Sequence, residues 1–242
     1  MTEITASITV IDSATSSSDL VWAAAAQGAP AGTAYLVREQ TAGRGRRGAG
    51  WSSARGGMYF SILLRPKIAA RHWFGLSFVA ALAIRQELAA CLVDVPVQVK
   101  WPNDILAGGG KLCGILLEAR DGAVVIGTGV NIAPVDNLPG AKHPATSLLS
   151  LGGDDITPDA LADRYAGNLL VRAAAYGTGG FDPVRMEWLV HCAHIGSMMR
   201  VLQSDVHVEG SFAGLGDDGA LHLRHSNGER HVVTTGDVEL MG

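Results

Sequence analysis

The sequence has few charged residues and few cysteines, and each shortage argues against a class of protein. Charged residues make up 17% of the 242 and the formal net charge is −4, which argues against a basic protein that coats nucleic acid. The three cysteines, Cys91, Cys113 and Cys192, form no CxxC pair, so neither a disulfide framework nor a zinc site is indicated. Hydrophobic residues reach 48%, which is enough for a packed core and argues against long disordered stretches.

Targeting signals and long apolar runs are also scarce. The first residues, MTEITASITVIDS, have neither a basic stretch nor an apolar core, so they do not read as a signal peptide. Apolar stretches are interrupted before they reach the length of a membrane-spanning helix. We therefore expect a protein of the reducing cytoplasm without membrane attachment.

Hydrophobic patterning predicts an α/β (α+β) domain over residues 1–195 and a small all-β domain over 196–242. The second part begins after Gly196, where short strands alternate with Gly-Asp turns every eight to ten residues, a spacing that suits a small barrel. In the first part, strands and helices are expected from the alternation and length of apolar segments. The predicted strands are 4–11, 33–40, 58–65, 97–101, 111–118 and 123–132, and the predicted helices are 19–28, 72–91, 158–176 and 182–193.

Residues 43–48, GRGRRG, match the G-x-G-x-x-G fingerprint of a dinucleotide-binding turn. That fingerprint needs a helix that opens at the third glycine, whereas AGWSSARGG and a further strand follow here. The loop instead offers backbone N–H groups and the guanidinium groups of Arg44, Arg46 and Arg47, which can wrap an anion with charge-assisted hydrogen bonds. A solvated, arginine-rich surface loop is the alternative, and the loop alone leaves both interpretations open.

The run VKWPNDILAGGGKLCGILLE holds a second cluster of polar residues. Two of only four lysines, Lys100 and Lys111, flank Asn103 and Asp104. Asp104 is suited to carry Mg²⁺, and Lys111 is suited to neutralise a phosphate or carboxylate oxygen. Pro102 favours an extended residue before it and hence a rigid turn. An ordinary Pro-Asn-Asp turn with an incidental surface lysine is the alternative.

A third cluster, TSSSD at 15–19, precedes the first predicted helix. Hydroxyl side chains there usually cap the helix, so Thr15, Ser16 or Ser17 is expected to do so. The same place also suits recognition of a small polar group, because free N–H donors point outwards from a helix N-terminus.

With QTAGRGRRGAGW, KWPNDI and GKLCGILLE in this order and at these intervals, the chain resembles the biotin protein ligases, which attach biotin to a carrier-protein lysine. The resemblance runs from about residue 8 to the C-terminus and includes GTGVNI, ATSL at 145–148 and the GDVEL of the tail. It implies a catalytic domain with a mixed β-sheet, similar to class II aminoacyl-tRNA synthetases, followed by an SH3-like β-barrel. Because the first strand starts within a few residues of Met1, we expect a monofunctional ligase without a DNA-binding domain or a DNA partner.

The chemistry that the resemblance implies has two steps. Biotin and ATP, with Mg²⁺, give biotinyl-5′-AMP and pyrophosphate; a lysine of a biotin carboxyl carrier protein domain then attacks the mixed anhydride and releases AMP. No covalent enzyme nucleophile is needed, so Cys113 is interpreted as a small core residue. A lipoate or octanoyl transferase would share the fold but lacks the arginine-glycine run followed by KWPND. A non-catalytic RNA-binding module is disfavoured by the acidic pI near 6.0.

Residue roles carried over from the resemblance fall into four sets. The catalytic set is Lys111, Arg44 and Arg46. The biotin-binding set is Thr15, Ser16, Ser17, Gln40, Gly43, Arg44, Gly45, Arg46, Lys111 and Gly114. The nucleotide-binding set is Arg46, Arg47, Trp51, Asn103 and Asn131, with Asp104 as the Mg²⁺ ligand. For Trp51, packing on the adenine and anchoring of the loop are both open.

One family motif is altered, because the usual Ser-Thr-Asn after the first strand is missing. An alignment on the helix puts Thr15-Ser16-Ser17 there, whereas an alignment on Asp12 puts Ser13-Ala14-Thr15 there. We prefer the first because it keeps the helix in register. A hydroxyl is then retained and the asparagine amide is lost.

Overall fold

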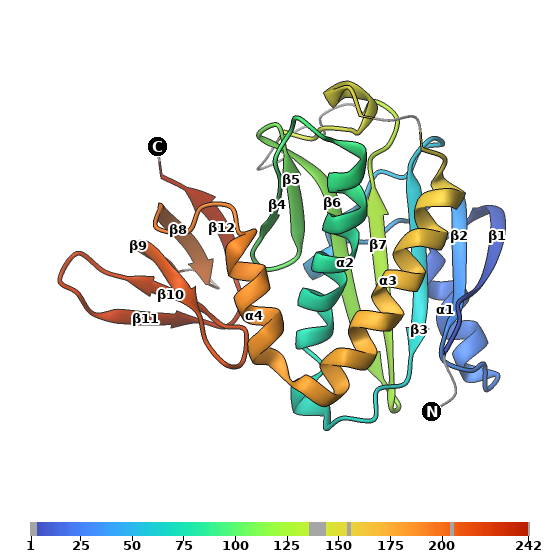
Figure 1. Ribbon diagram of the computed structural model, residues 1–242, viewed down its shortest axis with the longest axis horizontal. Coiled ribbons are helices and arrows are strands. Elements are labelled where there is room, and N and C mark those ends of the chain that lie inside the picture. Colours follow the sequence, from blue (N-terminus) through green and yellow to red (C-terminus); the bar gives the residue numbers. More distant parts are fainter. Residues whose placement is uncertain (1–3, 136–143, 154–155, 204–205, 242) are drawn as a thin grey trace.

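The computed structural model describes residues 4–135, 144–153, 156–203 and 206–241 (Figure 1). Within these residues the strands form a seven-stranded and a five-stranded sheet. The strands of the larger sheet are β1 (Ser7–Ala14), β2 (Thr33–Gln40), β3 (Met58–Leu64), β4 (Val97–Lys100), β5 (Asp104–Ala107), β6 (Gly110–Arg120) and β7 (Ala123–Val130). Those of the smaller sheet are β8 (Met198–Gln203), β9 (Val206–Leu215), β10 (Leu221–Arg224), β11 (Arg230–Val233) and β12 (Asp237–Leu240). The α-helices are α1 (Ser17–Ala26), α2 (Gly75–Cys91), α3 (Pro158–Gly179) and α4 (Phe181–Val190), and short 3₁₀ turns lie at Arg46–Gly48, Ala70–His72 and Leu149–Leu151.

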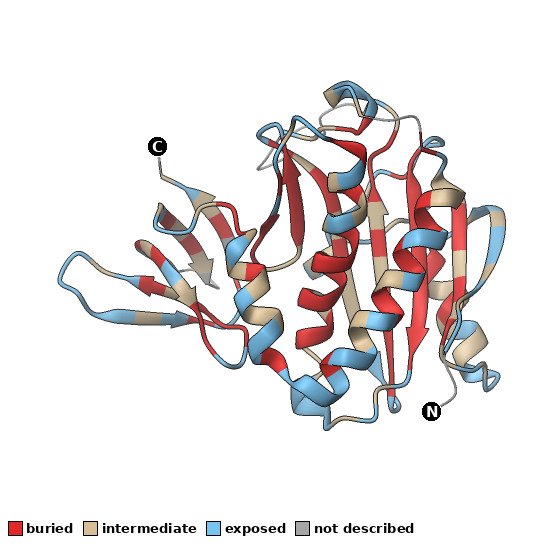
Figure 2. Cartoon of the chain, in the orientation of Figure 1, coloured by how far each residue is buried: buried red, intermediate tan, exposed pale blue. Residues whose placement is uncertain are grey.

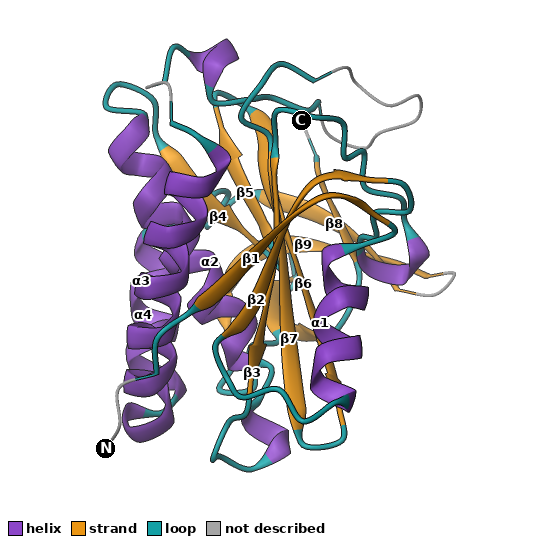
Figure 3. Cartoon of the chain, turned by 90° about the vertical axis from the view of Figure 1, so that its right-hand side faces the viewer, coloured by secondary structure: helices purple, strands orange, loops and turns teal. Residues whose placement is uncertain are grey.

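The larger sheet has the order β1-β2-β3-β7-β6-β5-β4 and is mixed. β1 and β2 run parallel, and the other neighbouring pairs run antiparallel. Figure 3 shows α1 on one face of this sheet and α2 and α3 on the other. The mixed sheet predicted for the first part is therefore confirmed, and β6 and β7 lie at its centre.

Helix α2 is apolar almost all the way round, as expected of a helix that is covered on every side. It packs against the sheet and against α3 and α4, and Leu82, Ile84 and Leu88 are buried. Figure 2 shows buried residues along much of this helix. The expectation that no apolar stretch reaches membrane-spanning length is wrong for Ala70–Cys91, which is long and apolar enough to cross a membrane by length and composition. However, 61% of its most apolar window is buried inside the protein.

The smaller sheet has the order β11-β10-β9-β8-β12 and all its pairs are antiparallel. Its inward side chains, such as Phe212 and Leu221, belong to the same buried cluster as the core of the larger sheet. The Trp101 Nε1–H also donates to the Gly219 carbonyl at 3.0 Å, which joins the KWPND turn to the second sheet. The chain passes from one sheet to the other between α4 and β8; the domain division at residue 195 stays a prediction.

Strand β5 was not predicted, because its four residues are too few to show an alternating pattern. It pairs with β4, so Lys100 lies opposite Asp104 and the three residues between them form a tight hairpin turn. Helix α1 begins at Ser17, two residues before the predicted start, because Ser16 is the N-cap and its Oγ accepts from the Ser18 N–H. One of the three expected capping residues is therefore confirmed.

Candidate active site

A pocket of about 480 Å³ lies where the N-terminus of α1, the 43–52 loop, the KWPND hairpin and strands β6 and β7 meet. Gly236 and Val238 of the second sheet complete its wall. The structure brings most of the predicted site residues together here although they come from distant parts of the chain. Those that line the pocket are Ser16, Ser17, Gln40, Arg44, Gly45, Arg46, Trp51, Asn103, Asp104, Lys111, Gly114 and Asn131.

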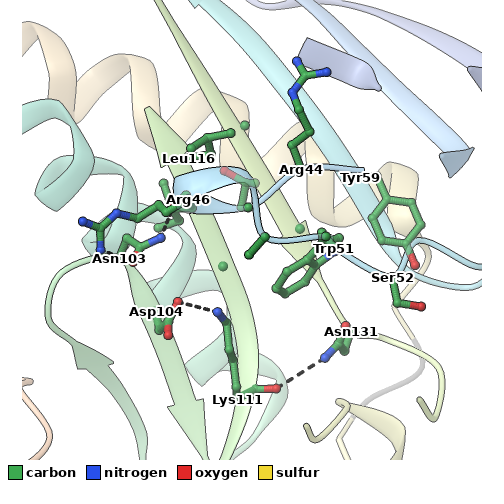
Figure 4. A pocket seen from close by; sticks show the side chains of 18 of the residues that line it. Arg44, Arg46, Trp51, Ser52, Tyr59, Asn103, Asp104, Lys111, Leu116 and Asn131 are labelled. Atoms are coloured by element: carbon green, nitrogen blue, oxygen red, sulfur yellow. Dashed lines mark hydrogen bonds and ion pairs between the residues drawn. The ribbon is translucent and has the colours of Figure 1, made fainter. Parts of the chain in front are cut away.

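Lys111 and Asp104 form an ion pair in the wall of the pocket, where β5 and β6 are neighbours. The Lys111 Nζ lies 2.7 Å from Asp104 Oδ1, and the two side chains are 28% and 12% exposed (Figure 4). The pair follows from the sheet, since β5 and β6 are neighbours there. Burial of both charges strengthens their attraction, and the pairing offsets the cost of removing them from water. Lys111 thus presents a positive charge to the pocket, and the ion pair with Asp104 fixes the position of that charge.

The Trp51 indole lies flat on two glycines. A Cβ added at Gly129 would come within 2.5 Å of Trp51 Nε1, and one at Gly114 within 2.8 Å of Trp51 Cζ3. These glycines are paired across β6 and β7, so together they form a floor without side chains. The Lys111 Nζ lies 5.3 Å from the Trp51 ring centroid, within the range of a cation–π contact. The ring therefore packs between the sheet and the cationic end of the pocket.

The three arginines of the glycine loop point in different directions. Arg44 makes two hydrogen bonds to the Asp19 carboxylate, at 2.7 and 3.0 Å, and points away from Lys111 (Figure 4). This contact lowers the pKa of Asp19 and raises the pKa of Arg44. The Arg46 guanidinium reaches Asn103 Oδ1 at 3.5 Å.

Arg47 is not among the residues that line the pocket, so its contact with the nucleotide stays a prediction. Its backbone has a φ of 54°, which is unusual for a residue with a Cβ. This conformation turns the side chain outwards, and its Nη2 donates to Thr235 Oγ1 at 3.1 Å. In this state Arg47 connects the loop to the second sheet.

Two predicted asparagines hold the backbone around the pocket. The Asn103 amide donates to the Ile115 carbonyl of β6, which ties the KWPND turn to that strand. The Asn131 Nδ2 donates to the carbonyls of Lys111, at 3.3 Å, and Thr146, at 3.0 Å. Both amides therefore fix the positions of other pocket residues, in addition to lining it.

The hydroxyl triplet that faces the pocket is Ser16-Ser17-Ser18, one residue later than Thr15-Ser16-Ser17. Thr15 lies outside because its Oγ1 donates to Asp19 Oδ2 at 3.1 Å, on the solvent side of α1. Gly43 also lies behind the wall, where an added Cβ would come within 2.5 Å of the Trp51 carbonyl oxygen. Neither residue is among those that line the pocket, and their contact with biotin stays a prediction.

Several lining residues were not singled out from the sequence. Gly127 and Gly129 lie in the GTGVNI segment, and their spacing of two puts them on the same face of β7 as Asn131. That period was available in the sequence and could have identified them. Lys100 was noted beside Asn103 and Asp104 but was given no role. The other lining residues within the sequence motifs that had no predicted role are Ser18, Leu116, Thr128, Ala145, Gly236 and Val238, and Ser52 and Tyr59 lie outside those motifs.

Tyr59 and Cys113 are poor candidates for acid–base or covalent chemistry. Burial raises the pKa of Tyr59 to about 12, and its hydroxyl donates to the Ala54 carbonyl at 2.6 Å. Burial also raises the pKa of the Cys113 thiol far above its usual value, so the reactive thiolate is suppressed. The expectation that Cys113 is a core residue is confirmed, since its side chain is fully buried.

The pocket therefore has two chemically different ends. Near α1 it offers neutral hydrogen-bonding groups from Ser17 and Gln40, and near β5 it offers the Lys111 cation, with the apolar Trp51 ring between them. Within the described residues, no cluster of three or more His, Cys, Asp or Glu could hold a metal by itself. Such an arrangement suits a ligand with a neutral polar head, an apolar middle and an anionic tail.

Two protein-family models match the chain. Residues 10–132 match the biotin/lipoate A/B protein ligase family, and residues 194–241 match the biotin protein ligase C-terminal domain. The two matches together cover most of both sheets and include every residue that lines the pocket except Val135 and Ala145.

Two curated relatives are similar over most of their length. The biotin–[acetyl-CoA-carboxylase] ligase of Paracoccus denitrificans is 37% identical over 212 residues, which cover 84% of this chain and 88% of that protein. The enzyme of the same name from Mycobacterium tuberculosis is 34% identical over 235 residues, which cover 95% of this chain and 86% of that protein.

Solved structures share the fold. The biotin protein ligase of Aquifex aeolicus in complex with biotin and ATP superposes with a TM-score of 0.84 at 24% identity, over 97% of this chain and 98% of that one. The biotin protein ligase of Leishmania major with biotinyl-5-AMP has a TM-score of 0.68 at 23% identity, over 94% and 98% of the two chains.

Proposed function

The chain belongs to the biotin protein ligase family, and on this premise we propose that it joins biotin to ATP as biotinyl-5′-AMP and then transfers biotin to a protein lysine. The acceptor is a biotin carboxyl carrier domain of a carboxylase, as the names of the relatives from P. denitrificans and M. tuberculosis imply. The reaction belongs in the cytoplasm, the compartment that supplies ATP.

The observation that carries this proposal is the polarity of the pocket. Biotin has a neutral cyclic urea, an apolar bicycle and a carboxylate on a short chain. The Ser17 and Gln40 groups match the urea, the Trp51 ring matches the apolar part, and the Lys111 cation matches the carboxylate. The order of these groups along the pocket is the order of the groups along biotin.

In the first step, the biotin carboxylate attacks the α-phosphate of ATP. Lys111, which lines the pocket, would contact both the carboxylate and the phosphate oxygens and would exchange part of its bond to Asp104 for them. Arg44 and Arg46, which also line the pocket, would join them by exchanging their contacts with Asp19 and Asn103 for the phosphate. Catalysis then comes from positioning two anions and balancing their charge, with no covalent enzyme intermediate.

In the second step, the carrier lysine amine attacks the acyl carbonyl of the mixed anhydride and AMP leaves. The cations that stabilised the first transition state also stabilise AMP as the leaving group. Burial by the 43–52 loop would protect the anhydride from water until the carrier arrives.

Mg²⁺ would enter this site with ATP. Asp104 lines the pocket and supplies a carboxylate, and Mg²⁺ usually keeps several waters and uses one or two carboxylates together with substrate phosphates. The donor set fits an ion delivered by the nucleotide, because the described residues offer no cluster that would hold it alone. When bound, the ion supplies further positive charge beside the phosphates.

The test is biotin-dependent exchange of pyrophosphate into ATP, followed by transfer of labelled biotin to a biotin carboxyl carrier domain. We expect both activities, with little exchange when lipoate replaces biotin. Exchange with lipoate and none with biotin would identify a lipoate ligase and overturn the proposal. Adenylation without transfer to any carrier domain would overturn its second half.

A further inference from the structure

A continuous series of hydrogen bonds runs behind Ser17 and Gln40, the two pocket residues that are proposed to bind the urea and that define the urea end of the pocket. The Ser61 hydroxyl on β3, which is completely buried, lies 2.7 Å from Ser17 Oγ and 3.0 Å from Ser18 Oγ. Gln40 Oε1 accepts from Ser17 through both its N–H, at 2.8 Å, and its Oγ, at 3.1 Å. On the other side, Gln40 Nε2 donates to Ser53 Oγ at 2.8 Å, and Ser53 Oγ donates to the Trp51 carbonyl at 3.1 Å.

The donors in this series can be assigned from one end to the other. The Ser17 backbone N–H can only donate, so the Gln40 atom that faces it is the oxygen. The Ser17 hydroxyl donates its single hydrogen to that oxygen. In the hydrogen bond between Ser61 and Ser17, Ser61 must therefore be the donor. The Ser61 hydrogen is thereby used, so Ser18 is the donor to Ser61. All hydrogens therefore point the same way, from Ser18 to Gln40.

Glycines on both sides leave room for this series and hold it in place. A Cβ at Gly127, which is paired with Ser61 across β3 and β7, would lie 3.0 Å from Ser18 Oγ. A Cβ at Gly43 would lie 2.6 Å from Ser53 Oγ and 2.9 Å from Gln40 Nε2. Gly43 of the arginine loop does not line the pocket, but its missing side chain leaves the room that Ser53 and Gln40 need for their hydrogen bond.

Within this series, the link between Ser17 and Gln40 is the one at which both partners line the pocket. Ser61 and Ser53 lie behind it. A cyclic urea presents a carbonyl acceptor next to an N–H donor. It can enter between Ser17 and Gln40, taking the Ser17 O–H on its oxygen and giving its N–H to Gln40 Oε1, without reversing any hydrogen bond of the series.

We propose that Ser61 and Ser53 are positioning residues that set the direction of the Ser17 hydroxyl and of the Gln40 amide, and thereby select a urea carbonyl over a donor at the same place. This rests on the proposed biotin ligase function. The two serines act through Ser17 and Gln40 and do not touch the substrate themselves. Their removal should affect recognition of the ligand head and leave the chemistry at the Lys111 end unchanged.

The test compares Ser61→Ala with wild type in direct calorimetric binding of biotin and of 2-iminobiotin at neutral pH, where the protonated guanidinium presents only N–H donors in place of the urea oxygen. With Ser61 absent, the Ser17 hydroxyl can rotate and accept as well as donate. We expect biotin affinity to fall about tenfold, the size of one net hydrogen bond, and the preference for biotin over 2-iminobiotin to shrink by a similar factor. In pyrophosphate exchange the biotin KM should rise while kcat and the ATP KM stay within about twofold.

Ser147→Ala is the matched control. Ser147 is also completely buried and also makes two hydrogen bonds, to Ser150 Oγ at 2.7 Å and from the Ser150 N–H at 3.1 Å, but it does not line the pocket. It should lower thermal stability to the same extent and leave the ligand preference unchanged. Ser53→Ala, which frees the Gln40 amide from the other side, should reproduce the loss of preference.

Two outcomes would overturn the proposal in distinguishable ways. If wild-type protein binds no biotin and exchanges no pyrophosphate, the proposed function fails and this inference fails with it. If wild type is active and both Ser61→Ala and Ser53→Ala keep the wild-type preference between the two ligands, the ligase function stands and the positioning role is wrong.

Discussion

At the scale of single residues, the pocket depends on charges that the protein already balances before any ligand arrives. Lys111 is paired with Asp104, Arg44 with Asp19, and Arg46 lies against Asn103. An anionic ligand therefore competes with groups of the protein for each cation. The Lys111 pair is the least exposed of these, so its charge is the one that solvent screens least.

Variants of Lys111 and Asp104 should distinguish the effect of the Lys111 charge on pyrophosphate exchange from its effect on the melting temperature. Lys111→Ala should lower biotin-dependent pyrophosphate exchange by about 10²–10³-fold, the typical loss for one preorganised group. It also leaves the mostly buried Asp104 carboxylate without its partner, which should lower the melting temperature. In Lys111→Ala/Asp104→Asn the melting temperature should recover and the exchange should not. Near-normal exchange in the single variant would show that Lys111 has no catalytic role.

The glycine floor under Trp51 gives a second prediction for single residues. Gly129→Ala places a Cβ 2.5 Å from Trp51 Nε1, so the ring must shift, at a cost of about 1–3 kcal/mol. Exchange should fall tenfold or more. Trp51→Phe removes the atom that collides, so the double variant should be less impaired than the sum of the two single variants. Strict additivity would contradict the contact.

At the scale of secondary-structure elements, the arginine-glycine loop is held by contacts that can be broken easily. The exposed pair Arg44–Asp19 is worth at most about 1 kcal/mol, and Arg47 adds one hydrogen bond to Thr235. The backbone between them closes on itself through the bridge of Arg44 with Gly50. We therefore expect the arginine-bearing part of the loop, residues 44–47, to open before either sheet does.

Protease sensitivity measures this opening. Trypsin should cleave at Arg44, Arg46 or Arg47 in the free protein, and biotin with ATP should slow cleavage by up to about 100-fold at ligand concentrations 100 times Kd. Asp19→Asn should accelerate cleavage of the free protein because Arg44 loses its partner. Cleavage at Arg230, an exposed residue on β11, is the internal control and should not respond to ligand. Equal protection of the loop with and without ligand would contradict the prediction.

The elements that carry the site differ in how far the sequence predicts them. GRGRRG and KWPND were recognisable because each combines rare residue types at fixed spacing, and the loop between two strands followed from the lack of a helix after Gly48. Strand β5 was missed because four residues show no period. The helix start was predicted two residues late because a run of serines does not show which of them is the N-cap.

Side-chain direction was beyond the reach of the sequence. Arg44 and Arg47 turn to Asp19 and Thr235, which are 25 and 188 positions away in the chain. The glycine floor needs the pairing of β6 with β7, and the buried Ser61 looks like any strand residue until β3 is placed against α1. Such long-range contacts depend on the assembled fold, which single-sequence patterns do not contain.

At the scale of the whole molecule, the two sheets share one hydrophobic core and one pocket. Gly236 and Val238 of the second sheet line the same pocket as Lys111 and Trp51. The KWPND turn is tied to the second sheet by the hydrogen bond from Trp101 Nε1 to the Gly219 carbonyl. The second sheet therefore supports the KWPND turn, where we propose that the nucleotide binds, and disturbing the junction should affect more than stability.

Gly219 and Gly228 give a matched test of this junction. Both have positive φ, 74° and 86°, so alanine imposes a similar backbone strain at each. A Cβ at Gly228 meets nothing within 4 Å, whereas one at Gly219 lies 2.9 Å from Phe78 Cε2 and 3.0 Å from Phe74 Cδ2. Gly219→Ala should therefore push the second sheet away from α2 and pull on Trp101, and each additional 1 kcal/mol should lower the melting temperature by about 2–4 °C.

Comparison of Gly219→Ala with Gly228→Ala also distinguishes a loss of stability confined to the second sheet from one that changes substrate binding in the pocket. Gly219→Ala should raise the KM for ATP in pyrophosphate exchange, because Asn103 and Asp104 follow Trp101 in the displaced turn, while biotin binding at the Ser17 end stays close to wild type. Gly228→Ala should lower the melting temperature through backbone strain alone and leave the KM for ATP and the affinity for biotin unchanged. If the two variants lose the same stability and neither changes the KM for ATP, the second sheet does not position the nucleotide side through Trp101. The pocket would then be organised by the larger sheet alone.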